Sequence, residues 1–349
     1  MTGWRLAGWT LATAALATGG GALFAALGWP AAWLMGAMVA VAFAALAGLP
    51  VGLPTRVREV AFLLLGISIG SAVTPEGLAT MAAWPGSIAL LAVSVLSTLF
   101  VASFYLEKVH GWDPVTARFA SMPGAFSSVV VIAASSTADM PRVILAQSLR
   151  VFTLVALMPP LLAFLSDGSM GPMSLAPTPD TNGFVEVLVV LAVSGAVAFT
   201  LNRLGVPAGT LLGAMVASAA LHATGVVHGR FPAPLVIIGF IATGAVIGAR
   251  FRGTTMTAVV RTVPGAVASI LLGLSISAGI AAFGAWSLGL PYGQLWLAYA
   301  PGGVEAMAAM ALALRLDPAF VGAHHVLRIL GLNAIGPFWL RRPRIPPAD

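Results

Sequence analysis

The sequence predicts an all-α polytopic membrane protein with two inverted structural repeats, about ten transmembrane helices and two re-entrant or broken helices. Three observations support this fold class: the apolar composition, an internal repeat and the distribution of positive charge. Of the 349 residues, 59% are hydrophobic and 8% are charged, whereas a soluble domain carries about 25% charged residues. Nearly continuous apolar runs of about 18 residues or more predict membrane-spanning helices rather than the strands of a barrel.

The composition also excludes several classes of function. The chain has no cysteine, which excludes disulfides, thiolate metal sites and iron–sulfur clusters. The net charge of +6 would suggest nucleic acid as the partner of a soluble protein. Because most basic residues flank apolar runs, membrane topology explains this charge better. We therefore expect a lipid bilayer around the protein, no nucleic-acid partner, and no cofactor or metal.

The chain repeats itself with a nearly constant spacing. The segment GWPAAWLMGAMVA begins at Gly28, and the similar segment GVPAGTLLGAMVA begins at Gly205. Further pairs share one common offset, a single position longer: Gly66 and Gly244, Gly70 and Gly248, Pro123 and Pro301, Gly124 and Gly302, Asp139 and Asp317, Gln147 and His325, and Arg150 and Arg328. We expect a first membrane repeat at 1–165, a linker at 166–183, a second membrane repeat at 184–340 and a cytoplasmic tail at 341–349.

Each half offers six apolar segments, which we expect to be helices. They cover about 8–27, 29–48, 58–74, 84–106, 114–137 and 141–165 in the first half, and about 184–204, 207–227, 232–249, 264–287, 291–314 and 318–340 in the second. The first segment resembles a signal peptide. Its counterpart at 184–204 predicts instead a helix that is retained in the fold.

The positive charges distinguish two topologies. If all twelve segments span, the halves are parallel and the Lys and Arg residues outside the membrane divide 9 to 6. If the fifth segment of each half is re-entrant, the halves are inverted and the division is 13 to 2, with Arg150 and Arg328 inside the membrane. This bias favours ten spans with both termini in the cytoplasm. The parallel arrangement is the alternative, because hydropathy alone does not distinguish the two.

Both fifth segments contain a helix break. Pro123 and Gly124 interrupt the first, and Pro301, Gly302 and Gly303 interrupt the second. Proline removes a backbone donor, and glycine permits non-helical dihedral angles. Paired breaks at matching positions of two repeats are typical of a transporter's binding site, although each break taken alone fits an ordinary kink.

Polar residues follow each break. They are Ser127 and Ser128 in the first half, and Glu305 at the position of Ser127 in the second. The half-helix after a break presents free N–H groups and the positive end of its dipole. We therefore expect these residues to belong to a substrate-binding site inside the membrane.

The sixth segments start with a cap and carry an arginine at depth. Asp139 and Asp317 each precede a helix start that contains proline, which is typical of an N-cap. Eleven residues separate Asp139 from Arg150 and Asp317 from Arg328, or about 16 Å of helix. Both arginines therefore lie near the bilayer centre and must face protein, water or a ligand.

Two interpretations of these arginines stay open. In the structural one, each guanidinium donates to carbonyls freed by the breaks, and one of the two pairs with Glu305. In the functional one, each guanidinium binds an anionic solute. Gln147 and His325 then contribute to the same site, since each lies three residues before an arginine on one helix face. Glu305 and His325 break the symmetry of the halves and are the candidates for proton coupling.

These motifs resemble the AbrB family of bacterial membrane proteins over essentially the whole chain. The resemblance rests on G-W/V-P-A and L-x-G-A-M near the start of each half, and on P-G and D…R in its last two segments. More distantly, the plan is similar to cation/proton antiporters and organic-anion carriers. The resemblance implies secondary transport in the bacterial inner membrane, with Pro123, Gly124, Pro301 and Gly302 at the broken helices.

Members of that family have been labelled ammonia monooxygenases and regulators of gene expression. The enzyme label fits poorly, because a copper site needs clustered histidines, and the adjacent His324 and His325 would point about 100° apart on a helix. We expect no catalytic residue. We expect a transporter of a small, anionic organic solute, and the alternative is a membrane regulator that senses a ligand without transport. Gly-x-x-x-Gly at 66/70 and 244/248 indicates helix packing within the protomer or in a homodimer.

Overall fold

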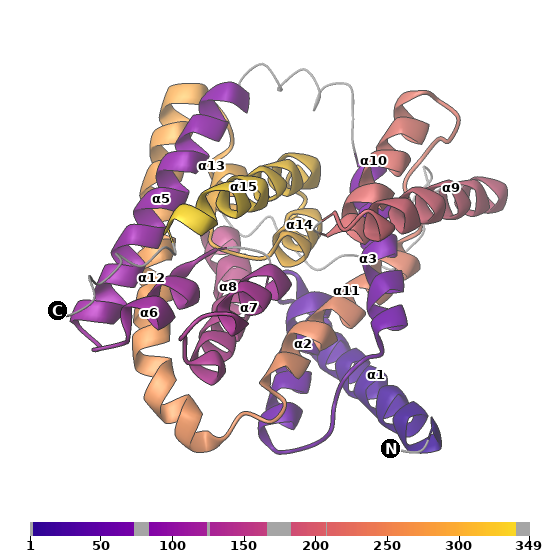
Figure 1. Ribbon diagram of the computed structural model, residues 1–349. Helices are drawn as coiled ribbons and strands as arrows, with labels where there is room; N and C mark the ends of the chain where they lie inside the picture. The colour runs from indigo at the N-terminus through magenta and orange to yellow at the C-terminus, as the bar shows by residue number, and fades with distance from the viewer. Residues whose placement is uncertain (1–2, 73–83, 124–125, 166–182, 207, 340–349) are drawn as a thin grey trace.

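The computed structural model describes residues 3–72, 84–123, 126–165, 183–206 and 208–339, and every element in these ranges is a helix (Figure 1). Six of the described helices are long and apolar enough to cross a membrane, and shorter apolar helices accompany them. The protein is therefore a helical membrane protein, as predicted. The predicted linker and tail lie almost entirely outside the described residues.

Six helices form one of two groups, which we call the scaffold bundle. They are α1 (Gly3–Ala26), α2 (Ala32–Leu46), α3 (Thr55–Gly70), α9 (Phe184–Arg203), α10 (Gly209–Ala223) and α11 (Ala233–Gly248). Figure 1 shows them together on the right of the molecule. Helix α1 packs on α2 and α9 packs on α10, whereas α3 packs on α10 and α11 packs on α2. The third helix of each half thus contacts the second helix of the other half.

The same turn precedes α2 and α10. Gly28 and Gly205 both have φ of 71°, while Ala31 and Ala208 have φ of 51° and 56°. Glycine adopts this left-handed conformation without strain, whereas for alanine it costs about 1–2 kcal/mol. The repeated sequence around these residues therefore encodes one turn that is used twice.

Glycines set the close approach of helices within the scaffold bundle. Gly66 and Gly70 face α10, and Gly244 and Gly248 face α2. A Cβ atom at any of the four would lie less than 3.0 Å from a backbone carbonyl O of the facing helix. The two Gly-x-x-x-Gly motifs therefore pack helices within the protomer.

The remaining helices form the core bundle. They are α5 (Trp84–Lys108), α6 (Pro114–Ser121), α7 (Phe126–Ala134), α8 (Met140–Leu165), α12 (Met256–Leu288), α13 (Tyr292–Tyr299), α14 (Val304–Ala313) and α15 (Pro318–Trp339). Helices α5 and α12 pack along each other at the left edge of Figure 1. Within each half, α6 contacts α8 and α13 contacts α15. The short helices α13 and α14 are almost entirely buried.

Helix α12 corrects one predicted boundary. The apolar run predicted a start near residue 264, but the helix begins at Met256. Thr255 caps it by accepting a hydrogen bond from Ala258 N at 3.2 Å. The helix thus continues through Arg261 and Pro264, ahead of the apolar run.

Candidate functional site

The fifth segment of each half consists of two short helices, as predicted. Residues 122–125 separate α6 from α7, and residues 300–303 separate α13 from α14. Both Pro-Gly sequences fall in these gaps. Gly124 and the side chains of Ser127 and Ser128 lie outside the described residues.

Arg150 and Gln147 of α8 hold the first break. Arg150 Nη1 donates to the carbonyl O of Met122 at 3.0 Å, and its Nη2 donates to Gln147 Oε1. Gln147 Nε2 donates to the carbonyl O of Phe119 at 2.7 Å and to that of Met122 at 3.1 Å. The two side chains have exposed fractions of 4% and 1%. Carbonyls that lose their helical donors at the break thus find new donors on α8.

The second break is held in the same way by α15. Arg328 Nη1 donates to the carbonyl O of Ala300 at 2.7 Å, and its Nη2 donates to that of Gly302. His325 Nε2 donates to the carbonyl O of Leu297 at 2.9 Å. The donors, and the acceptors at Leu297 and Ala300, occupy the same repeat positions as their counterparts in the first half. Both arginines therefore support the backbone of a broken helix.

The predicted ion pair between one of these arginines and Glu305 is wrong. No salt bridge within 4.0 Å joins Glu305 to Arg150 or Arg328 in the described part of the chain. The reason is geometric. The two guanidinium groups point at backbone carbonyls, whereas the Glu305 side chain leaves the first turn of α14 towards a cavity.

Asp139 and Asp317 make the contacts of helix N-caps. Asp139 Oδ1 accepts a hydrogen bond from Arg142 N at 3.1 Å, and Asp317 Oδ1 accepts one from Phe320 N at 3.0 Å. These bonds satisfy backbone N–H groups in the first turns of α8 and α15. They therefore help fix where the two arginine-bearing helices begin.

The adjacent histidines face different partners. His324 Nε2 lies 2.9 Å from Ser87 Oγ, which lies 2.9 Å from the hydroxyl of Tyr299. His325 instead faces the backbone of α13. All of these side chains are buried. Among the described residues, no group of three His, Asp or Glu side chains is placed to hold a metal ion.

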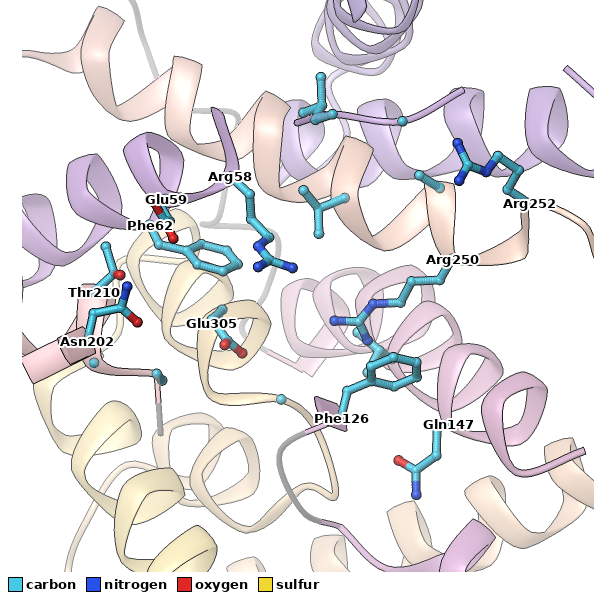
Figure 2. Close-up of a pocket in the computed structure, with 18 of the residues that line it drawn as sticks. Arg58, Glu59, Phe62, Phe126, Gln147, Asn202, Thr210, Arg250, Arg252 and Glu305 are labelled. Atoms are coloured by element: carbon cyan, nitrogen blue, oxygen red, sulfur yellow. The ribbon is translucent and has the colours of Figure 1, made fainter. Parts of the chain in front are cut away.

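A cavity of about 700 Å³ lies between the scaffold bundle and the core bundle. The scaffold contributes the start of α3, the turn between α9 and α10 and the end of α11, while the core contributes the starts of α7 and α14 and the middle of α8 (Figure 2). Arg58, Asn202 and Arg252 on the rim are exposed, whereas Gln147 and Arg150 are buried. The cavity thus runs from the surface to the first helix break.

The charged residues of the wall are Arg58, Glu59, Arg150, Arg250, Arg252 and Glu305. Four arginines face two glutamates, so the wall carries a surplus of positive charge. The Cζ atom of Arg250 lies 4.6 Å from the ring centroid of Phe126, and its buried Nη1 has no hydrogen-bond partner. Figure 2 shows the guanidinium groups of Arg58 and Arg250 and the carboxylate of Glu305 pointing towards one space. Such a wall attracts an anionic group.

Residues 33–343 match the family described as Transition state regulatory protein AbrB. The chain belongs to the AbrB family. An Escherichia coli K12 protein named as a regulator, AbrB, is 29% identical over 321 residues, which cover 90% of each chain. YhjN of Bacillus subtilis 168 is 24% identical over 357 residues, which cover 94% of this chain and 91% of YhjN. Together with its apolar helices, this match identifies an AbrB-family membrane protein.

The cavity of this AbrB-family protein brings together four of the predicted site residues: Gln147, Arg150, Gly303 and Glu305. A direct contact between any of them and a solute stays a prediction. Gln147 Nε2 and Arg150 Nη1 donate to backbone carbonyls, and Arg150 Nη2 donates to Gln147. The Glu305 carboxylate is half-buried and accepts no hydrogen bond from a described residue.

Other predicted site residues do not line this cavity. Pro123, Pro301 and Gly302 are buried in the breaks themselves. His325 and Arg328 are buried, with exposed fractions of 0% and 3%, and bond to the second break. Their proposed contacts with solute or proton stay predictions.

Arg58, Arg250 and Phe126 were not among the predicted site residues. Arginines at the ends of spans are explained by topology, and a phenylalanine is ordinary in an apolar segment. One signal in the sequence points to both arginines. The equivalent positions in the opposite halves hold Val236 and Ala72, so these charges, like Glu305, belong to one half only.

Proposed function

We propose that this AbrB-family protein is a secondary transporter that moves a small organic solute with a negatively charged group across the bacterial inner membrane. The observation that carries this proposal is the arginine-lined cavity between two helix bundles. Both half-helices that follow the breaks start at this cavity, since Phe126 begins α7 and Glu305 lies in the first turn of α14. Free N–H groups at helix starts and guanidinium groups both favour an anion.

Transport requires that the cavity open to each side of the membrane in turn. Two bundles that meet around a cavity can rock or slide as bodies to achieve this. Our proposed topology has inverted repeats, ten spans, two re-entrant segments and cytoplasmic termini. In that topology the exposed rim residues Arg58, Asn202 and Arg252 lie on the cytoplasmic side. The structure then represents the inward-open state.

Proton coupling is the finer part of the proposal. Glu305 faces Arg58 and Arg250 across the cavity, and Arg150 lines the same wall. Protonation of Glu305 would raise the net charge of the wall by one and so change its affinity for an anion. We expect the flux to depend on pH in the parent protein. A Glu305→Gln, His325→Gln double variant should lose this dependence, and an unchanged pH profile would refute the coupling.

The name of the Escherichia coli relative favours a second function. A regulator would bind the solute in the same cavity and change its contacts with a partner without moving the solute. Binding is therefore common to both functions, and flux distinguishes them.

The test is transport by the purified full chain in liposomes, measured as uptake of each of a series of radiolabelled small carboxylates. We expect a saturable signal for at least one of them. Arg250→Gln should lower the initial rate about tenfold at subsaturating solute, because a charged hydrogen bond contributes about 1.5–3 kcal/mol. Arg56→Gln is the matched control, since Arg56 is exposed and outside the cavity wall. Thermal stabilisation by a carboxylate without flux would favour the regulator.

A further inference from the structure

Three charged side chains that point towards one space in the cavity come from different bundles. Arg58 of α3 and Arg250 of the short 3₁₀ helix η2 (Ala249–Phe251) come from the scaffold bundle, whereas Glu305 comes from the core bundle. The charges of Glu305 and Arg58 both act on Arg250. In the described chain, no ion pair within 4.0 Å joins any two of the three. No ion pair with a described residue therefore neutralises these three groups, and each can bond to a ligand in the space that they share (Figure 2).

The broken helix does not need the carboxylate of Glu305. Arg328 and His325 already satisfy carbonyls at that break. The equivalent position in the first half is Ser127, and α7 forms there without a negative charge. A carboxylate in the first turn of α14 favours the helix dipole only slightly. Its position in the wall of an anion-binding cavity would weaken binding of a solute that carried negative charge alone.

Arg58, Arg250 and Arg252 are the cavity arginines whose guanidinium groups donate no hydrogen bond to a described residue. Arg150 donates to the backbone of the first break, as described above. Arg250 is held against the Phe126 ring at 4.6 Å, which fixes its guanidinium by a cation–π contact. Neither Arg58 nor Arg250 donates a hydrogen bond to a described residue. Arg58 and Arg250 point towards the same space as Glu305, whereas Arg252 lies on the exposed rim (Figure 2), so the anion-binding side of the cavity is the Arg58–Arg250 pair.

We infer that the solute is a small zwitterion of amino-acid type, with its carboxylate on Arg58 and Arg250 and its ammonium group on Glu305. This inference rests on the proposed function, because it names the class of solute for the same site. The cavity volume of about 700 Å³ lies within the range of small-molecule sites. A zwitterion links the two bundles, since its charged ends bind opposite walls. Phe62 and Phe126 also line the cavity, and their rings would contact the apolar part of the solute.

Matched probes test the inference on the purified full chain in detergent. Thermal unfolding, followed by tryptophan fluorescence, is measured with each standard amino acid in turn. The best binder is then compared with its two truncated analogues. For leucine these are isocaproate, which lacks the ammonium group, and isoamylamine, which lacks the carboxylate. We expect the amino acid to bind about tenfold to a hundredfold more tightly than either analogue.

Variants test which wall residue binds the ammonium group of the solute and which binds its carboxylate. Glu305→Gln should weaken binding of the amino acid to the level of its carboxylate analogue, and leave the analogue no weaker. Arg250→Gln should weaken both. Glu107→Gln is the matched control, because Glu107 pairs with Lys108 outside the cavity, and it should change neither. Unfolding without ligand shows that each variant is folded.

Two results would overturn the inference: a carboxylate analogue that binds as tightly as the amino acid, or no stabilisation by any standard amino acid. Either result leaves transport of a simple anion standing if carboxylates move in the liposome assay. Conversely, a preference for the zwitterion that Glu305→Gln abolishes, without uptake of the radiolabelled amino acid into liposomes, supports the inference and overturns the transport function.

Discussion

Replacement of Gly248 by alanine tests how tightly α11 is held against α2. The added Cβ atom would lie 2.5 Å from the carbonyl O of Met38, 2.8 Å from Ala42 N and 2.9 Å from Val41 Cβ. Ordinary contact begins at about 3.4 Å, so one helix must move by about 0.9 Å relative to the other. Two of the three atoms are backbone, and they cannot rotate away. Overpacking of this kind costs about 1–3 kcal/mol.

Gly279→Ala is the matched control, because Gly279 lies in α12 with nothing within 4 Å of its Cβ position. Both variants gain the same helix propensity, about 1 kcal/mol. The difference between their unfolding free energies therefore isolates the close approach, and we expect Gly248→Ala to be the less stable by about 1–3 kcal/mol. Denaturant titration of the purified protein in detergent measures both. Equal stability of the two variants would refute the packing argument.

The other predictions concern single contacts and the topology. Asp317→Ala should destabilise the protein by about 1 kcal/mol, and Asp317→Asn by less, since both Asp and Asn are good N-caps; equal losses in denaturant titration would contradict the cap. Ser87→Ala should cost about 1–3 kcal/mol in the same titration, because it leaves the buried Nε2 of His324 without its hydrogen-bond partner; an unchanged midpoint would show that this bond contributes nothing. Single cysteines introduced at Pro141 and at Arg315 should react with a membrane-impermeant reagent from opposite sides of the membrane. Labelling from the same side would favour twelve spans over ten.

The sequence predicts the helix breaks and the arginines that hold them better than it predicts the cavity wall. The repeat spacing locates both helix breaks and the arginines that hold them, because a charge at bilayer depth and a Pro-Gly pair are rare in apolar segments. The depth of Arg150 and Arg328 follows from helix rise alone. Their partners, the carbonyls of Met122, Ala300 and Gly302, follow from the break.

The cavity wall was not predictable in the same way. Arg58 and Arg250 lie at the ends of helices, where basic residues are ordinarily explained by the positive-inside rule. Their common cavity with Glu305 depends on the packing of α3 and α11 against helices of the other half, which no local pattern encodes. Contacts between distant helices leave no period in the sequence, whereas the helix breaks recur in both halves.

The exchange of α3 and α11 between the halves has a consequence for how the protein is made. Helix α3 is synthesised about 140 residues before its partner α10, counted from Gly70 to Gly209, and chains emerge from the ribosome in order. During that interval the face of α3 that carries Gly66 and Gly70 has no helix to pack against, and its backbone is exposed to lipid. The scaffold bundle can assemble only after the second half has inserted. A truncated first half would keep the α3 face exposed, and the α10 helix of a second chain could bind there.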